Sequence, residues 1–229
     1  LHIHTIASGH AYNTILEYIN RAKELKMKII GFSEHGPSTE GSVCETYFNC
    51  LDRLPRKIGN LTILRGVEAN VINKKGDIDI SDKIIKNKLD YVIAGLHKNK
   101  DFKVKKDNAV ALVNAIRSGK VNMLSHPFLN NQIYFDVERV FTEACKHNVL
   151  LEMNCHFSVV PEIKENLKIM IQVVKKYKKK VIVNSDAHNI WELGDDSALK
   201  KIKKEIGLTD NLIINNYPKE LLKLLKINV

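Results

Sequence analysis

Short apolar runs rich in β-branched residues recur along this chain about once every 30 residues, the length that one strand, one crossover helix and two loops require. The runs are centred on Ile3, Ile30, Leu64, Ile93, Met123, Leu151 and Val183. This spacing predicts seven strands that alternate with helices. No linker rich in Pro, Gly or Ser and no break in composition interrupts the series, so we expect a single domain over residues 1–229.

The segments between the apolar runs show helical periodicity. Ile15, Ile19 and Ala22 fall on one face of a predicted helix, behind a capping-box pattern at Thr14 and Glu17. Further helices are expected after Asp107, Asp136, Pro161 and Asp196. The sequence also predicts a short helix over 51–58 and a small excursion over 71–80 with a turn at 75–77.

Continuous apolar runs such as 91–94 and 181–183 are typical of strands buried on both faces, which is the character of a parallel sheet. Parallel strands that alternate with helices form either a closed barrel or a doubly wound open sheet. The position of the polar residues distinguishes these two architectures.

Six of the seven apolar runs end, on their C-terminal side, at a histidine or a carboxylate. The side chains at or just beyond these ends are His2, His4, His10, His35, Glu68, His97, His126, Asp186 and His188. In a parallel barrel the strand ends converge on one mouth, whereas an open sheet spreads them along a crevice. The barrel therefore gathers these side chains in one place.

So many imidazoles in a small volume would lose solvent and repel one another on protonation unless a partner held them. Neutral imidazole is the commonest metal ligand, and bridging carboxylates hold cations close together. His2 and His4 lie two residues apart on a strand, so their side chains point the same way and can share one ion. Asp186 and His188 have the same relation, and the pattern indicates a metal centre.

The net charge of +10 rests on lysine, because only six of the 36 basic residues are arginine. Proteins that read nucleic acids usually rely on arginine, so nucleic-acid binding is not favoured, although it stays open. The cysteines at 44, 50, 145 and 155 form no CxxC pair, which favours reduced thiols and a cytoplasmic protein. No apolar stretch approaches the roughly 20 residues that a bilayer crossing needs, and no leader peptide is visible.

These motifs resemble those of the PHP superfamily, named for polymerase and histidinol phosphatase, and most closely its stand-alone bacterial phosphatases. The segments that carry the resemblance are Leu1–Thr5 with His10, Glu34–Pro37, Leu64–Asn70, Ala94–His97, Ser125–Pro127, Leu151–Asn154 and Ser185–His188. They follow the family order over the length of the chain. The resemblance implies an α/β fold, a distorted (β/α)7 barrel of parallel strands with outer helices, similar to a TIM barrel.

The resemblance also implies three divalent metal ions, usually zinc and sometimes manganese or iron. Carried over by position, the first ion would bind His2, His4, Glu68 and Asp186. The second would bind Glu68, His97 and His126. The third would bind His10, His35 and His188.

The implied activity is hydrolysis of small phosphate esters by a metal-activated water, with Glu68 and Asp186 as catalytic carboxylates. A metal-bound water is the first candidate for the general acid and His156 the second, because His156 shares strand parity with Glu152. The lysine-rich loop at 98–106 favours an anionic substrate, although a merely solvated loop would account for it equally well. Glu34 and Cys155–His156 depart from the family pattern and are expected to bear on substrate choice.

Several alternatives remain open beside the phosphatase. A phosphodiesterase or nuclease related to polymerase proofreading domains is one, and a histidinol phosphatase is another. A two-metal amidohydrolase is less favoured because it has no use for His10, His35 and His188. A non-catalytic domain is disfavoured because every ligand position is filled. The sequence leaves the physiological substrate, the native metal and the formation of a homo-oligomer undetermined.

Overall fold

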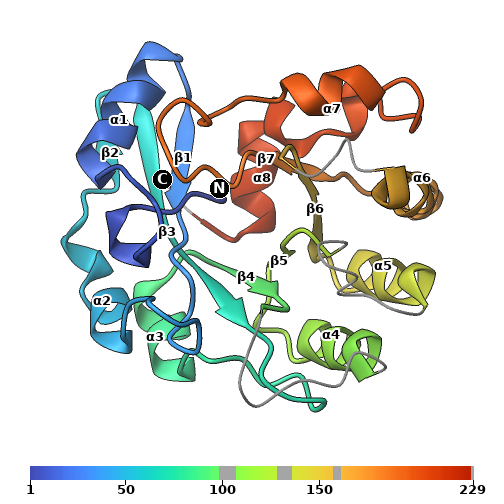
Figure 1. The fold of residues 1–229 in the computed structure, drawn as a ribbon, viewed down its shortest axis with the longest axis horizontal. Coiled ribbons are helices and arrows are strands. Elements are labelled where there is room, and N and C mark those ends of the chain that lie inside the picture. Colours follow the sequence, from blue (N-terminus) through green and yellow to red (C-terminus); the bar gives the residue numbers. More distant parts are fainter. Residues whose placement is uncertain (98–106, 128–135, 157–160, 228–229) are drawn as a thin grey trace.

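Parallel strands at the middle of the molecule are surrounded by helices in the computed structural model, which describes residues 1–97, 107–127, 136–156 and 161–227 (Figure 1). The strands follow the order β1-β3-β4-β5-β6-β7, and each neighbouring pair is parallel. Their bounds are Ile29–Phe32, Leu61–Asn70, Tyr91–Gly95, Met123–Leu124, Leu150–Asn154 and Ile182–Asn184. A two-residue strand, β2 (Lys57–Ile58), adds an antiparallel edge to β3.

The N-terminal segment joins the two ends of this strand series. Ile3 forms a parallel bridge with Ala187, just beyond β7, and the His4 amide donates to the Ala187 carbonyl at 2.9 Å. On the other side, the Ser33 amide, just beyond β1, donates to the Ile3 carbonyl at 3.0 Å. The predicted barrel is confirmed, although its first strand is reduced to a bridge. The extended segment stays short because Thr5 caps a 3₁₀ turn over Ile6–Ser8.

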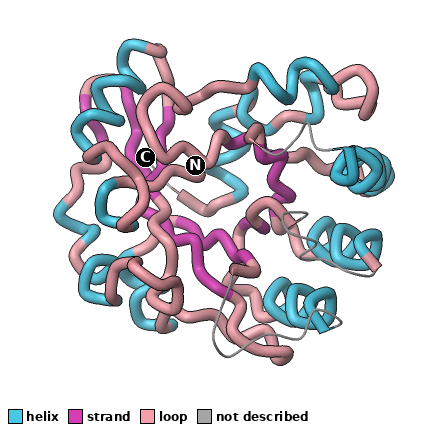
Figure 2. The backbone as a smooth tube through the Cα atoms, in the orientation of Figure 1, coloured by secondary structure: helices cyan, strands magenta, loops and turns pink. Residues whose placement is uncertain are grey.

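Helices cover the outside of the strands, as the cyan and magenta segments of Figure 2 show. The helix α1 covers Ile15–Glu24, and the predicted capping box between Thr14 and Glu17 is formed. The other helices are α2 (Glu45–Asn49), α3 (Asp82–Lys88), α4 (Asn108–Arg117), α5 (Val137–Lys146), α6 (Pro161–Lys176), α7 (Ser197–Ile202) and α8 (Pro218–Leu224). None of the helices in the described part of the chain is long and apolar enough to cross a bilayer.

The predicted helix over 51–58 is wrong. A helix forms earlier, at α2, and is followed by a 3₁₀ turn over Leu51–Arg53 and then by β2. Pro55 explains the difference, because a proline disfavours helical backbone in the residue before it, and Leu54 is extended. The excursion over 71–80 is confirmed by an antiparallel bridge between Val71 and Ile78 and by a left-handed Gly76 at φ 85°.

Apolar side chains fill the end of the barrel opposite to the histidines. Leu64, Ile93, Met123, Leu150 and Ile182 form one buried cluster there. Leu221 and Leu225 of α8 pack against the same cluster. The apolar packing therefore supports the strands from one end and leaves the polar end, at the carboxyl termini of the strands, for the site.

Candidate metal centre

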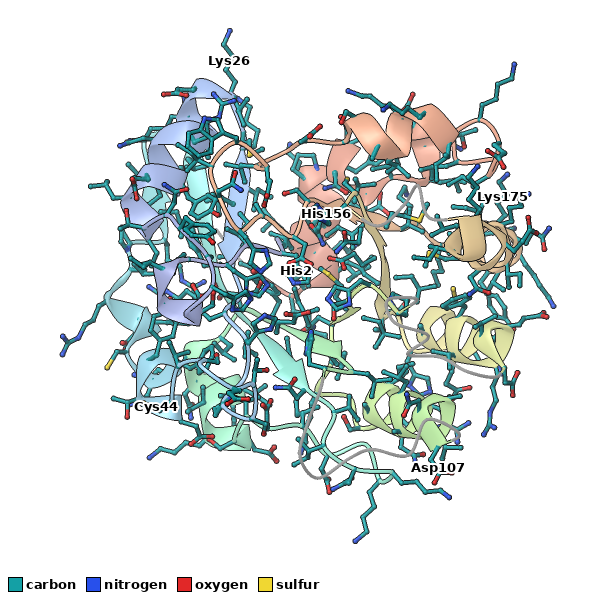
Figure 3. All side chains as sticks on the ribbon, viewed as in Figure 1. His2, Lys26, Cys44, Asp107, His156 and Lys175 are labelled. Atoms are coloured by element: carbon teal, nitrogen blue, oxygen red, sulfur yellow. The ribbon has the colours of Figure 1, made fainter. Side chains whose placement is uncertain are left out.

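His2 and His4 lie at the bottom of the polar end, one on each side of the bridging residue Ile3. Both are fully buried, and their Nε2 atoms are 3.1 Å apart. The alternation of side chains in an extended segment explains this, since it turns both imidazoles to one side and Ile3 to the apolar core. Figure 3 shows His2 near the middle of the strands.

Glu68, on β3, is the carboxylate around which the imidazoles gather, and it is fully buried. Its Oε1 atom lies 3.2 Å from Nε2 of His2, 3.1 Å from Nε2 of His97 and 3.0 Å from Nε2 of His126. Its Oε2 atom lies 2.7 Å from Nδ1 of His35 and 3.4 Å from Nε2 of His4. One carboxylate thus contacts five imidazoles from four separate segments of the chain.

Asp186 approaches the same centre from the end of β7. Its Oδ1 atom lies 3.2 Å from Nε2 of His2 and 3.1 Å from Nε2 of His4. Its backbone is left-handed at φ 53°, a conformation that Asp tolerates better than most residues do. Asn154 donates to Oδ2 at 3.1 Å and holds the carboxylate in this orientation.

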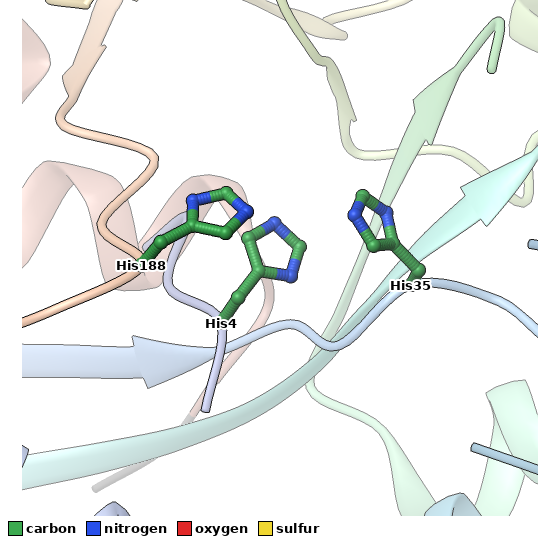
Figure 4. Close-up of side chains that lie close together, drawn as sticks. All are labelled: His4, His35 and His188. Atoms are coloured by element: carbon green, nitrogen blue, oxygen red, sulfur yellow. The ribbon is translucent and has the colours of Figure 1, made fainter. Parts of the chain in front are cut away.

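A third group of imidazoles lies beside the first two. Figure 4 shows His4 between His188 and His35, with ring centroids 4.7 and 4.2 Å away respectively. Nε2 of His10 is 3.3 Å from Nε2 of His35. Nδ1 of His10 and Nδ1 of His188 contact the carbonyls of Ser8 and Asp186 at 3.0 and 2.8 Å, so both rings carry their proton on Nδ1 and present Nε2 as an electron-pair donor.

The structure brings together all nine residues that the sequence predicts as metal ligands. Four triads have ligand atoms within 4.8 Å of one another, and these are His2–His4–Asp186, His2–Glu68–His126, His35–Glu68–His97 and His4–His35–His188. The last triad contains His4 in the place that the family resemblance gives to His10. His10 lies beside this triad, with its Nε2 atom 3.3 Å from Nε2 of His35. The ligand atoms therefore form one continuous cluster rather than three separate sites.

The electrostatics of the cluster are those of tightly packed opposite charges. Burial alone would lower the pKa of His4, but Asp186 and Glu68 outweigh this effect and raise it to about 9. Burial lowers the pKa of His35 to about 3, against the opposing pull of Glu68. Burial alone would raise the pKa of Glu68, yet the surrounding imidazoles, His2 foremost, hold it well below its usual range.

Several buried polar atoms of this cluster have no hydrogen bond of normal geometry within the described part of the chain. Among them are both carboxylate oxygens of Glu68, Nε2 of His97 and Oδ1 of Asp186. Each such atom costs about 1–3 kcal/mol when it is left unpaired. Imidazole nitrogens and carboxylate oxygens aimed at a shared centre suit divalent cations, so the residues present fit the metal ions that the sequence implies.

Glu152, on β6, is a functional candidate that the sequence reasoning did not assign. It is fully buried, and its Oε1 atom lies 2.8 Å from Nδ1 of His2. It also accepts hydrogen bonds from the His126 amide at 2.7 Å and from Asn184 at 2.8 Å. The signal was available, because a glutamate inside an apolar strand must face a polar partner.

We expect Glu152→Gln to weaken zinc binding by about 10- to 100-fold, the usual effect of losing a carboxylate that orients a ligating histidine. Glutamine has one acceptor atom, so it cannot serve the His2 ring and the His126 amide together. Competition with a chromogenic chelator measures the affinity. Glu143→Gln is the matched control, because Glu143 is also buried but pairs with Arg117 outside the cluster. Equal affinities in the two variants would contradict this role.

His156 does not join the buried cluster. It is exposed in the turn after β6, where its amide donates to the Asn154 side chain at 3.0 Å, and Figure 3 marks its position. Its role as general acid stays a prediction. The lysine-rich loop at 98–106 lies outside the described residues.

The expectation that Glu34 and Cys155 bear on substrate choice stays a prediction, and the structure shows that both side chains are buried. The Glu34 carboxylate accepts hydrogen bonds from the Thr5 amide and from the Thr5 hydroxyl, the latter at 2.6 Å. It therefore supports the backbone that follows His4 instead of facing the mouth of the barrel.

The parallel strands and outer helices define an α/β barrel, and the histidine–carboxylate cluster at its strand ends could hold metal ions. The sequence matches the PHP domain over residues 1–225, and the chain belongs to the PHP family. It is 38% identical over 234 residues to a probable phosphatase of Clostridium acetobutylicum, covering 99% of this chain and 93% of the relative. It is 33% identical to a probable phosphatase of Photobacterium profundum, covering 98% and 92%. The names of these relatives support a phosphatase activity for this chain.

Two solved structures share the fold. One is the histidinol phosphate phosphatase of Lactococcus lactis, complexed with zinc, L-histidinol and phosphate, with a TM-score of 0.60 and 15% identity. The alignment covers 91% of this chain and 93% of that chain. The other is a chain in an archaeal ribonuclease P structure with mature tRNA, with a TM-score of 0.60 and 19% identity, covering 98% and 89%.

Proposed function

We propose that this protein is a metal-dependent phosphoesterase that hydrolyses small phosphate monoesters at a site for three divalent ions, with zinc the favoured metal. The observation that carries the proposal is the convergence of seven imidazoles on the buried Glu68 and Asp186. Both carboxylate oxygens of Glu68 and Oδ1 of Asp186 lack hydrogen bonds of normal geometry within the described residues. The phosphatase names of the relatives support the reaction class. The zinc and phosphate of the Lactococcus enzyme support the metal and the ligand chemistry.

The nine candidate ligands differ in how deeply they are buried, and we assign their roles accordingly. His2, His4 and Glu68 are fully buried and would hold ions from below, with Glu68 shared between two of them. His97 and His188 are partly exposed, with side chains 14% and 28% accessible, and they face the side from which a substrate can enter. His10 is exposed beside them, so a phosphate group would meet the cluster at the edge formed by His10, His97 and His188.

Divalent ions bound there would supply a nucleophilic hydroxide at neutral pH and positive charge for the phosphate oxygens. The role of Glu68 and Asp186 is to keep those charges close together and to fix them against the imidazoles. Glu152 and Asn154 hold His2 and Asp186 in place by hydrogen bonds, so that the ligands need not reorganise during the reaction. His156 follows the end of β6 by two residues and remains the second candidate, after a metal-bound water, for proton donation to the leaving group.

The proposal is tested by combining metal analysis with a substrate panel. Elemental analysis of the purified protein should find two to three transition-metal ions per chain. Zinc-, manganese- and iron-loaded samples would then be assayed on phosphomonoesters, on a phosphodiester and on single-stranded DNA. Turnover confined to monoesters supports the proposal, whereas cleavage of the diester or DNA at a matching rate would support the nuclease alternative. Absence of hydrolysis in every metal form would overturn it.

Zinc binding to the metal-free protein is expected to release protons at pH 7. The carboxylates raise the pKa of His4 to about 9, so this ring is protonated at neutral pH, and a zinc ligand must be neutral. The affinity for zinc should accordingly rise as the pH increases from 7 to 9. Calorimetric titrations in buffers of different ionisation enthalpy count the released protons. A proton count of zero at pH 7 would contradict this prediction.

A further inference from the structure

The ring of His97 is held from behind by Asn70, at the end of β3. Nδ1 of His97 lies 2.8 Å from the side-chain oxygen Oδ1 of Asn70. An amide oxygen can only accept a hydrogen bond, so Nδ1 must carry the proton. In the neutral ring the other nitrogen, Nε2, then carries the electron pair that would bind a metal ion, and it lies 3.1 Å from Glu68 Oε1.

The orientation of the Asn70 amide is itself fixed. Its nitrogen Nδ2 donates to Oδ2 of Asp79 at 2.6 Å and lies 3.5 Å from the carbonyl oxygen of Gly36. Both of these groups are acceptors only. Rotating the amide by half a turn would place an oxygen against two oxygens, so Asn70 must turn Oδ1 toward His97.

Asp79 is held just as firmly. It lies at the end of the 71–80 excursion. Its Oδ1 atom accepts a hydrogen bond from the backbone amide of Asn70 at 2.7 Å, and its Oδ2 atom accepts one from the backbone amide of Ser38 at 2.8 Å. Gly36 leaves the space that the carboxylate occupies, because a Cβ atom there would lie 2.2 Å from Oδ1 of Asp79. The excursion thus brings a negative charge to the back of the site without contacting the cluster.

We propose that Asp79 is a positioning residue that sets the tautomer of His97 through Asn70 and thereby sets the zinc affinity at the His97 side of the centre. The inference rests on the metal centre of the proposed function. No charge needs to move, since the effect is carried by the direction of two hydrogen bonds. With the Asn70 amide reversed, its NH₂ group would face Nδ1, and the proton would move to Nε2, where it would block coordination.

Asp79→Asn tests this chain of contacts. The new side chain keeps an oxygen for the Asn70 backbone amide and places its NH₂ group toward the Asn70 side chain, which must then reverse. The reciprocal exchange, Asn70→Asp with Asp79→Asn, restores the original direction, because an aspartate at 70 accepts from both neighbours. Asp77→Asn is the matched control, since Asp77 is exposed on the same excursion and its side chain contacts Asn73.

We expect Asp79→Asn to weaken the binding of one zinc ion by about 10- to 100-fold and the reciprocal double variant to recover most of that loss. The Ser38 amide faces an NH₂ group in both variants, so thermal stability should stay lowered even where zinc affinity recovers. A purely structural role would instead make affinity follow stability. Chelator competition measures the affinity of the intact protein, and thermal melting reports the folded fraction.

The tautomer is read directly by ¹⁵N NMR of histidine-labelled protein, with the His97 signals assigned by their loss in His97→Gln. Nδ1–H in the wild type and Nε2–H in metal-free Asp79→Asn would support the proposal. Nε2–H in the wild type would overturn it even if no variant folded, as would a folded Asp79→Asn with the zinc affinity of Asp77→Asn. A wild type with no zinc affinity would overturn the proposed function and the effect on zinc affinity, whereas control of the His97 tautomer by Asp79 would still hold if the proton moved from Nδ1 to Nε2 in Asp79→Asn.

Discussion

Chelation of the divalent ions is expected to lower phosphatase turnover by more than about 1000-fold, and addition of zinc should restore it. The cluster offers imidazoles and carboxylates. Without metal ions these groups supply neither a hydroxide at neutral pH nor enough positive charge to stabilise the phosphoryl group in the transition state. The barrel should stay folded without metal, because the apolar cluster around Leu64 and Ile93 lies at the other end of the strands. Steady-state assays and circular dichroism on the same samples measure both quantities.

A sample carried through the same dialysis without chelator is the control for losses in handling. Zinc, manganese and iron are then added back separately, and the metal content is measured before each assay. Full turnover in protein shown to be free of metal would rule out the mechanism. Loss of turnover together with loss of the folded signal would show that the ions also stabilise the barrel, and the mechanism would then rest on reconstitution alone.

Glu68→Gln is expected to reduce turnover by at least about 100-fold and to lower the metal content of the purified protein. Glutamine keeps the size of the side chain but removes the negative charge and turns one acceptor into a donor. That donor would point at imidazole nitrogens that lie 2.7–3.4 Å from the carboxylate oxygens in the native protein. Metal analysis and kcat on the best monoester measure the two effects.

Glu143→Gln again provides the matched control, because it makes the same chemical change at a buried glutamate that contacts Arg117 and His147. It should keep the metal content and turnover of the wild type. If Glu68→Gln also kept both, Glu68 would be removed from the centre. If it kept the metal but lost turnover, the carboxylate would be needed for the reaction and not for holding the ions.

Much of the fold was predictable because the signals are local. A buried parallel strand needs a run of apolar residues, and the runs at Ile30, Leu64, Ile93, Met123, Leu151 and Val183 all lie in or beside observed strands. The site residues were predictable for a related reason. Six of the seven runs end at a histidine or a carboxylate, and the topology brings these side chains to the same end of the barrel.

The interactions between distant segments were not predictable in this way. The contact of Glu152 with His2 joins positions 150 residues apart, and no periodicity reports it. The path from Asp79 through Asn70 to His97 depends on which way an amide faces, which is decided by neighbours in three dimensions. The prediction of a helix over 51–58 was wrong because Pro55 disfavours helical backbone at Leu54, an effect that the apolar pattern does not report.

The bridge at Ile3 links the closure of the barrel to the assembly of the candidate metal ligands. The segment that completes the ring of strands is also the one that carries His2 and His4, and it meets Ala187 near the opposite end of the sequence. Closing so long a loop costs more entropy than a local contact does, so we expect this contact to form late in folding. We therefore expect that a chain in which Ile3 and Ala187 have not yet met lacks a complete set of the candidate ligands, so that ion binding follows this contact.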